Sequence, residues 1–159
     1  MKGNKMTIFK SVLNKEDLLD SRDIIDRIQE LAKFQIEVFN EQQSLEDDDD
    51  LQIEEEDYNN DHFRYWLKEA PSDEDREELK ALLALNDECE GLSDWTYGET
   101  LIHSNYWVEY VEGLLIDCGD LPKEIPHYIA IDWEKTADNI EQDYMRVDFG
   151  GEEYLIRNC

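Results

Sequence analysis

The sequence predicts a mostly helical α+β fold: a small helical domain with a C-terminal β-hairpin, preceded by an amphipathic N-terminal helix and an acidic linker. Three observations support this prediction. Apolar residues recur at three- and four-residue spacing in several segments, which is typical of amphipathic helices. After residue 143 the spacing changes to two, which is typical of strands. Residues 44–61 are rich in acids and contain no base. The expected parts are therefore 1–43, 44–61 and 62–159.

The charge of the chain is large and unevenly distributed. The net charge is −27 over 159 residues. Up to Ser44 the chain has 7 bases and 8 acids, whereas the remainder has 8 bases and 34 acids. Residues 81–122 contain no Lys or Arg. Because hydrophobic residues make up 40% of the chain and aromatic residues 11%, we expect this acidic region to fold and to display its charge on a fixed surface.

The composition excludes several classes of function. A net charge of this sign excludes nucleic-acid binding through a basic patch and disfavours anionic membranes, so the expected partner is a basic protein surface. No apolar run is long enough to span a membrane, and the lysines of residues 1–10 are not followed by the apolar stretch of a signal peptide. The 3 cysteines are far apart, which predicts a reducing cytoplasm rather than a disulfide framework or a zinc site.

The first expected helix covers residues 14–43. Asn14 is its candidate N-cap, and Ser21 could cap or restart a second piece. Its apolar stripe could dock on the rest of the chain or pair with a second copy in a homodimer, and comprises Ile24, Ile25, Ile28, Leu31, Ala32, Val38 and Phe39. Two interpretations of the acidic run that follows stay open. It is either a self-repelling linker or a part of the acidic surface that orders when a partner binds.

Two further segments precede the aromatic-rich region. Residues 62–69 predict a short amphipathic helix or strand anchored by Phe63, Trp66 and Leu67. A second helix follows Ser72, its expected N-cap. The inner face of this helix is Leu79, Leu82 and Leu83, and its outward acids are Asp73, Glu74, Glu77 and Glu78.

Residues 105–118 and 133–140 predict two more helices, capped by Ser104 and Asp132. The first has an inner stripe from Trp107 to Cys118, Glu109 and Glu112 on the opposite face, and Gly119 as its end. The second has Trp133, Ala137, Ile140 and Tyr144 inward and Glu134, Asp138 and Glu141 outward. Residues 144–149 and 153–157 then predict strands joined at Gly150-Gly151, a hairpin turn.

Catalytic and metal-binding patterns are missing from the sequence. It contains no glycine-rich phosphate loop, no G-x-S-x-G and no H-E-x-x-H, and residues 47–50 lack the glycine of an EF-hand loop. No ligand-like spacing around the 3 histidines rises above the acidic background, so we expect structural histidines. The Trp and Tyr residues fall on inward helical faces, which favours a core over base stacking. We therefore expect no enzyme, no cofactor and no metal.

The acids predict a polyanionic surface that imitates DNA. B-DNA carries one charge per about 1.7 Å of axis, so 27 charges correspond to roughly 13 base pairs. The candidate partner-binding residues are Glu46, Asp47, Asp48, Asp49, Asp50, Glu54, Glu55, Glu56, Asp57, Asp73, Glu74, Glu77, Glu78, Glu109, Glu112, Glu134, Asp138 and Glu141. The alternative hypothesis is an acidic adaptor or regulator that binds a partner through Ile24, Ile28, Leu31 and Val38 without imitating DNA.

Three segments of the C-terminal half carry a family pattern, namely EELKALLAL from Glu77, LIHSNYWVEYVEGLLIDCGDLPKEIPHYIAIDWEKTADNI from Leu101 and the terminal YLIRNC. Through these segments, residues 71–159 resemble the ArdA antirestriction proteins. The best-matching positions are Leu101–Ser104, Tyr106, Tyr110, Leu121-Pro122, Ile131–Glu134, Ala137 and 150–157. The segments SRDIIDRI (21–28) and DWTYGETLI (94–102) also resemble short acidic phage-borne proteins.

This resemblance implies an anti-defence protein that occupies the DNA-binding groove of a type I restriction–modification enzyme in the host cytoplasm. It also implies an elongated dimer of small domains. The chain departs from the family at its N-terminus, where the first family domain has no counterpart. The target could therefore be another host complex that binds nucleic acid, including a CRISPR effector.

Overall fold

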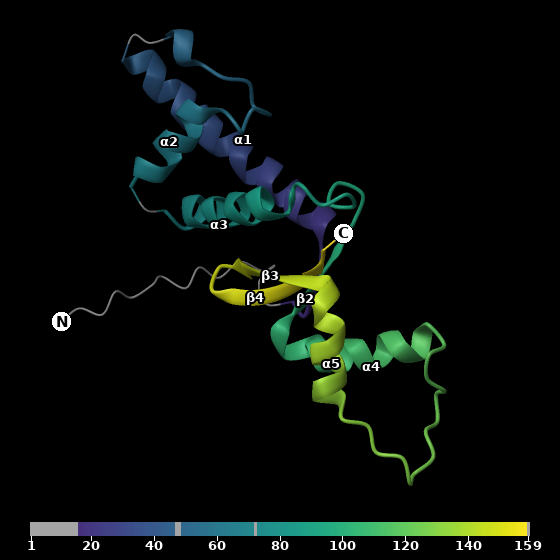
Figure 1. The fold of residues 1–159 in the computed structure, drawn as a ribbon. Coiled ribbons are helices and arrows are strands. Elements are labelled where there is room, and N and C mark those ends of the chain that lie inside the picture. The colour runs from purple at the N-terminus through teal and green to yellow at the C-terminus, as the bar shows by residue number, and fades with distance from the viewer. Residues whose placement is uncertain (1–15, 47–48, 72, 159) are drawn as a thin grey trace, which may run out of the picture.

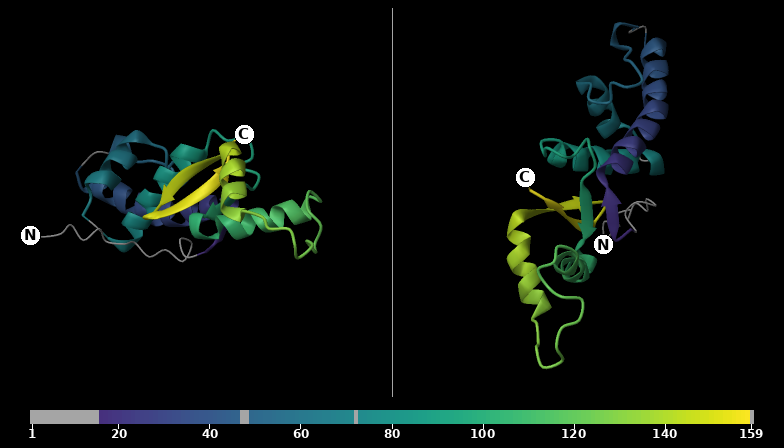
Figure 2. Two further views of the ribbon diagram at one scale, coloured as in Figure 1. Left: turned by 60° about the horizontal axis from the view of Figure 1, so that its bottom comes forward. Right: turned by 90° about the vertical axis from the view of Figure 1, so that its right-hand side faces the viewer.

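The computed structural model describes residues 16–46, 49–71 and 73–158. Figure 1 shows an elongated body with a four-stranded sheet across its middle. Helices α1, α2 and α3 lie on one side of the sheet and α4 and α5 on the other, and the two further views in Figure 2 show the same arrangement. The expected mostly helical α+β fold is confirmed.

The elements of the described residues follow one another in a mixed order. They are β1 (Leu18–Asp20), α1 (Ser21–Leu45), η2 (Asp49–Leu51), α2 (Asp61–Glu69), α3 (Glu74–Cys89), β2 (Thr100–His103), η3 (Ser104–Tyr106), α4 (Trp107–Asp117), α5 (Trp133–Ile140), η4 (Glu141–Asp143), β3 (Tyr144–Phe149) and β4 (Glu152–Arg157). The elements labelled η are 3-10 helices.

The sheet has the strand order β1-β2-β4-β3, and every pair is antiparallel. The predicted hairpin is confirmed: Phe149 pairs with Glu152 across Gly150 and Gly151, whose φ angles are 60° and 87°. Two positive φ angles are typical of the tight type I′ turn, which glycine adopts without strain. The sequence did not predict β1 and β2. With 3 and 4 residues, they are too short to show a clear alternation.

The central strands are buried on both faces and so join two apolar clusters. Leu101 of β2 and Ile156 of β4 belong to a large cluster with α1, α2 and α3. Their neighbours Ile102 and Leu155 belong to a smaller cluster with Trp107 of α4 and Ala137 of α5. Successive side chains of a strand point to opposite faces, and this alternation places the helices on the two sides of the sheet.

Helix α1 begins later than the predicted residue 14. Asn14 lies outside the described residues, and the N-cap of α1 is Asp20, whose carboxylate accepts a 2.9 Å bond from the backbone N–H of Arg22. Ser21 does not cap the helix. It is buried, donates to the Trp95 carbonyl at 2.6 Å and accepts from the Glu99 N–H at 2.7 Å. Ser21 therefore fixes the start of α1 to the loop before β2.

The described part of the acidic segment contacts α1 and the large apolar cluster. The Asn40 side chain donates to the Ile53 carbonyl at 2.9 Å and accepts from the Ile53 N–H at 3.0 Å. Ile53 and Tyr58 also pack against the large cluster. These contacts offset the repulsion between neighbouring acids. The division of the chain at residues 43 and 61 stays a prediction.

The helix starts were predicted with mixed success. Asp132 caps α5 as expected, since its carboxylate accepts from the Lys135 N–H at 3.0 Å. Ser72, the expected cap of α3, lies outside the described residues, and the carboxylate of Asp73 is the N-cap. The turn η3 precedes α4, and it is capped by His103 rather than begun by a cap at Ser104.

Candidate functional site

Six of the eleven Lys and Arg residues in the described chain form internal ion pairs with acids. In each pair, a nearby carboxylate neutralises the positive charge of the Lys or Arg side chain. The pairs join Arg22 to Asp20, Arg27 to Glu30 and Glu78, Lys33 to Glu55, Arg64 to Asp87, Lys80 to Glu77, and Arg146 to Glu141 and Glu153. These pairs lie on α1 to α3 and on the β3–β4 hairpin. The candidate acids therefore divide into those with a basic partner and those without.

Glu78 was predicted to point outward, and this prediction is wrong. Its side chain is 7% exposed because Arg27 reaches across from α1. The Nε and Nη2 atoms of Arg27 each donate a 2.9 Å bond to one carboxylate oxygen of Glu78. Glu77 is only partly exposed and accepts from Lys80 at 3.0 Å. Glu78 joins two helices and cannot contact a partner.

The candidate acids of α4 and α5 are exposed at one end of the body. Glu109, Glu112, Glu134 and Asp138 are all exposed, as predicted. Within the described residues, none of these four carboxylates takes part in an ion pair. The prediction for Glu141 is wrong. This residue begins η4, is half-buried, and pairs with Arg146 of β3.

The acids of residues 46–57 are placed at the opposite end of the body. Those with described side chains are exposed, namely Glu46, Asp50, Glu54, Glu55, Glu56 and Asp57. Glu55 lies 3.9 Å from Lys33 of α1. Asp47 and Asp48 lie outside the described residues, and Asp49 is placed only as part of η2. Between the two ends, Asp73 and Glu74 are exposed at the start of α3.

The candidate acids therefore follow the long axis of the molecule and do not gather in one cluster. In Figure 1 the acidic segment lies at the far end of α1, and α4 and α5 lie at the other end, beyond the sheet. The two views of Figure 2 agree with this placement. Helices α4 and α5 cross rather than run side by side.

The residues of the adaptor hypothesis lie mostly in the core. Ile24 and Ile28 are 0% exposed and Leu31 is 5% exposed, so they cannot meet a partner. A different stripe of α1 is accessible. Phe34, Val38 and Leu45 are 60%, 39% and 86% exposed. Phe34 and Leu45 were not predicted from the sequence. Val38 and Leu45 follow Phe34 by four and eleven residues, which places the three on one helical face.

The burial and hydrogen-bond partners of the histidine and cysteine side chains matter because these residue types often carry catalysis or bind metals. His103 is buried, lies 2.7 Å from a Glu152 oxygen through Nε2 and accepts from the Asn105 N–H through Nδ1. Burial raises the pKa of the Cys89 thiol to about 12. Cys118 was predicted to lie on the inner stripe of α4, but it is exposed because the helix ends at Asp117. In the described ranges, no group of three or more His, Cys, Asp or Glu side chains is placed to hold a metal ion.

The whole chain was also compared with known proteins. We found no match to it among models of protein families, curated proteins or solved structures. The resemblance to the ArdA family therefore stays a prediction that rests on short motifs. Across the described residues, no helix combines the length and the apolar character that crossing a membrane requires. The function must accordingly be argued from the surface itself.

Proposed function

We propose that this protein is a DNA mimic that binds the basic DNA-binding cleft of a host defence enzyme in the cytoplasm and blocks the access of DNA. A type I restriction–modification enzyme is the first candidate target, and a CRISPR-type complex is the second. The observation that carries the proposal is the set of exposed acids on α4 and α5, which have no basic partner among the described residues.

A DNA-binding cleft offers cations to a polyanion that enters it. Its Arg and Lys side chains form charge-assisted hydrogen bonds with phosphates, and binding releases counterions from the polyanion. Exposed carboxylates offer acceptors of the same charge. Because Glu109 and Glu134 have no internal base to give up, binding a cleft requires no ion pair of the described chain to break at these positions. Glu77 and Glu78 would lose such a pair.

The spacing of the charges supports a partial match to duplex DNA. Glu134 and Asp138 are separated by about 6 Å along α5, given a rise of about 1.5 Å per residue. A DNA strand carries one phosphate per about 3.4 Å of axis, so α5 has roughly half that density. The 25 residues of α1 alone give a length of about 37 Å, close to 11 base pairs. The elongated body is therefore comparable with a short duplex in length.

The experiment that tests the proposal is a competition for DNA. Purified protein is titrated into a type I methyltransferase bound to a labelled duplex containing its site, and in a second arm into a CRISPR effector complex bound to its target. We expect displacement of DNA by one of these enzymes, and weaker displacement as the salt concentration rises. Failure to displace DNA from either enzyme at low salt would remove the support for these targets.

A second candidate function is favoured by the exposed stripe of α1. Phe34, Val38 and Leu45 could bind an apolar surface of a partner, as expected of an adaptor without DNA mimicry. The substitutions Phe34→Ser and Val38→Ser separate the two functions, because they leave the acids of α4 and α5 unchanged. Loss of DNA displacement in this double variant, with the fold intact, would favour the adaptor.

A further inference from the structure

A pocket between α2 and α3 carries positive charge in a chain that is otherwise strongly negative. Its volume is about 440 Å³, within the range of about 300–1,000 Å³ that is usual for small-molecule sites. One face of each helix lines the pocket. Helix α2 contributes Arg64, Leu67 and Lys68, and α3 contributes Lys80 and Leu83, which are three residues apart and so lie on one face of α3. The lining residues include none of the acids assigned to the DNA-mimic surface, although Lys80 is bonded to one of them, Glu77.

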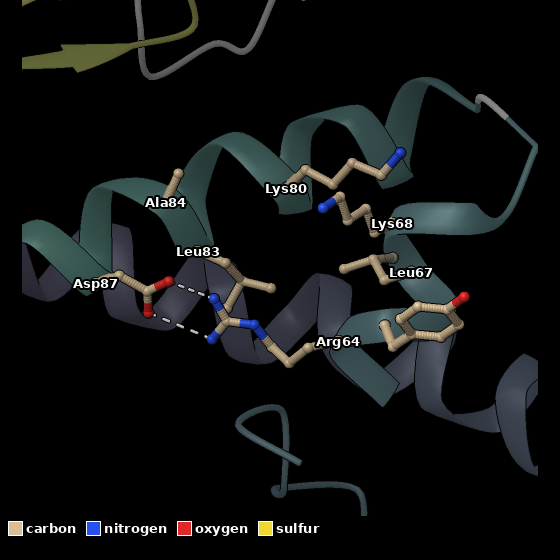
Figure 3. Close-up of a pocket in the computed structure, with 8 residues that line it drawn as sticks. Arg64, Leu67, Lys68, Lys80, Leu83, Ala84 and Asp87 are labelled. Atoms are coloured by element: carbon tan, nitrogen blue, oxygen red, sulfur yellow. Dashed lines mark hydrogen bonds and ion pairs between the residues drawn. The ribbon is translucent and has the colours of Figure 1, made fainter. Parts of the chain in front are cut away.

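The pocket has one neutralised end and one basic end. At one end, Arg64 and Asp87 form an ion pair that connects α2 to α3. Figure 3 shows this pair at one end, Lys68 and Lys80 toward the other, and Leu83 between them. Leu67 and Leu83 are each only 2% exposed, so they form an apolar floor. An apolar floor with two ammonium groups above it suits a ligand with an apolar body and an anionic group.

The two lysines are not equally neutralised within the chain. Lys80 is bonded to Glu77 at 3.0 Å. Lys68 is exposed, and no ion pair among the described residues includes it. A cation in the last turn of α2 is favoured by the helix dipole, which accounts for Lys68. The dipole does not account for Lys80, because this residue lies in the second turn of α3 and the dipole favours cations only in the last turn.

We propose that this pocket binds a small organic anion: an apolar or aromatic body on Leu67 and Leu83, with a carboxylate or phosphate between Lys68 and Lys80. The net charge of −27 opposes anion binding at long range. At physiological salt the Debye length is about 8 Å, so an anion in the pocket responds mainly to the groups beside it, which are the two lysines and the Glu77 carboxylate bonded to Lys80. The binding is independent of the proposed DNA mimicry.

The test uses three probes that share one aromatic body: 2-naphthoate, 2-naphthyl phosphate and neutral 2-naphthol. Each is titrated into the full chain while backbone amide NMR shifts of residues 64–68 and 80–87 are followed. We expect an anion to bind with a Kd on the order of 1 mM and naphthol to bind about fivefold more weakly. The tighter of the two anions identifies the preferred head group.

Two variants and a matched control separate a site from general charge effects. Lys68→Gln with Lys80→Gln is expected to raise the Kd about tenfold. Lys123→Gln with Lys135→Gln removes the same charge outside the pocket and is expected to leave the Kd unchanged. Ala84→Phe, a change at an exposed position of the lining, is expected to block binding without a change of charge. Equal binding of naphthol, equal weakening in the control, or binding that survives Ala84→Phe would overturn the proposal.

Discussion

Arg27 of α1 holds Glu78 of α3 through two parallel N–H···O bonds of 2.9 Å each. The hydrogen bonds to Glu78 are the largest cause that raises the pKa of Arg27. Of the acids assigned to the partner-binding surface and described in the structure, Glu78 is the buried one. Its carboxylate therefore acts within the fold, whereas Glu109 and Glu112 remain available at the surface.

The substitution Glu78→Gln is expected to lower the free energy of unfolding by about 1–3 kcal/mol. The amide keeps the volume but can no longer accept both charged bonds from Arg27. This decrease in the free energy of unfolding is smaller than for a fully buried ion pair, because the Arg27 side chain is 32% exposed and water can reach it. Urea titration of both proteins measures the change. Glu74→Gln, at an exposed position, is the control and is expected to cost less than about 0.5 kcal/mol. Equal losses in the two variants would contradict this assignment.

Removal of the Ser21 hydroxyl is expected to destabilise the protein although Ser21 does not cap α1. In Ser21→Ala, the Trp95 carbonyl and the Glu99 N–H lose the partner that now satisfies them. A buried polar group without a partner costs about 1–3 kcal/mol. Thr96→Ala removes an exposed hydroxyl from the same loop and is expected to be nearly neutral. The difference in urea midpoint between these variants checks the prediction, and similar midpoints would refute it.

Features that depend on neighbouring residues were well predicted. The stripe of α4 identified Trp107 and Val111 as buried, and the glycine pair at 150 and 151 identified the hairpin. Both signals lie within one short segment of sequence. The burial of Glu78 depends on Arg27, which is 51 residues away. A helical periodicity cannot show such a partner, so the outward assignment of Glu78 followed the pattern and was wrong.

Long-range pairing explains the strands that the sequence did not predict. Leu18 of β1 pairs with Ile102 of β2, and these residues are far apart in the chain. The same limit applies to the acidic segment, where composition alone favoured a linker. Two hydrogen bonds between the Asn40 side chain and the Ile53 backbone hold this segment to α1. Such bonds do not require a recognisable sequence motif, so the sequence did not predict them.

The stability of the protein is expected to fall at alkaline pH through Cys89. Burial, and to a lesser extent Glu88, raise the pKa of this thiol from 9.0 to about 12. The folded chain therefore retains the proton where the unfolded chain releases it, so this contribution is complete below pH 9 and is lost as the pH rises toward 12. When the pH rises from 8 to about 10.5, the free energy of unfolding of Cys89→Ala is expected to fall by about 2 kcal/mol less than that of the parent protein. The exposed Cys118→Ala serves as the control, and a decline in Cys89→Ala as steep as in the parent would exclude this origin.

Salt is expected to stabilise the fold while it weakens the proposed binding to a target. The net charge of −27 produces repulsion within the folded chain, and added ions screen it. Raising NaCl from about 20 mM to about 0.5 M shortens the Debye length severalfold and is expected to raise the urea midpoint. The same change is expected to reduce displacement of DNA from the target. A midpoint that falls with NaCl would show that attraction within the ion pairs outweighs the repulsion.

The position of the acids, rather than their number, is the central claim, and two variants of equal charge test it most directly. One carries Glu109→Gln, Glu112→Gln, Glu134→Gln and Asp138→Asn on α4 and α5. The other carries Asp23→Asn, Asp26→Asn, Glu37→Gln and Glu41→Gln at exposed positions of α1. Both are compared with the parent protein in displacement of a labelled duplex from the methyltransferase, after circular dichroism has verified the fold.

We expect the α4–α5 variant to need at least about tenfold more protein for half displacement, because each lost carboxylate removes a charge-assisted contact. The α1 variant is expected to stay within about threefold of the parent, since distant exposed charges are screened. An equal loss in both variants, or full displacement by the α4–α5 variant, would contradict the account.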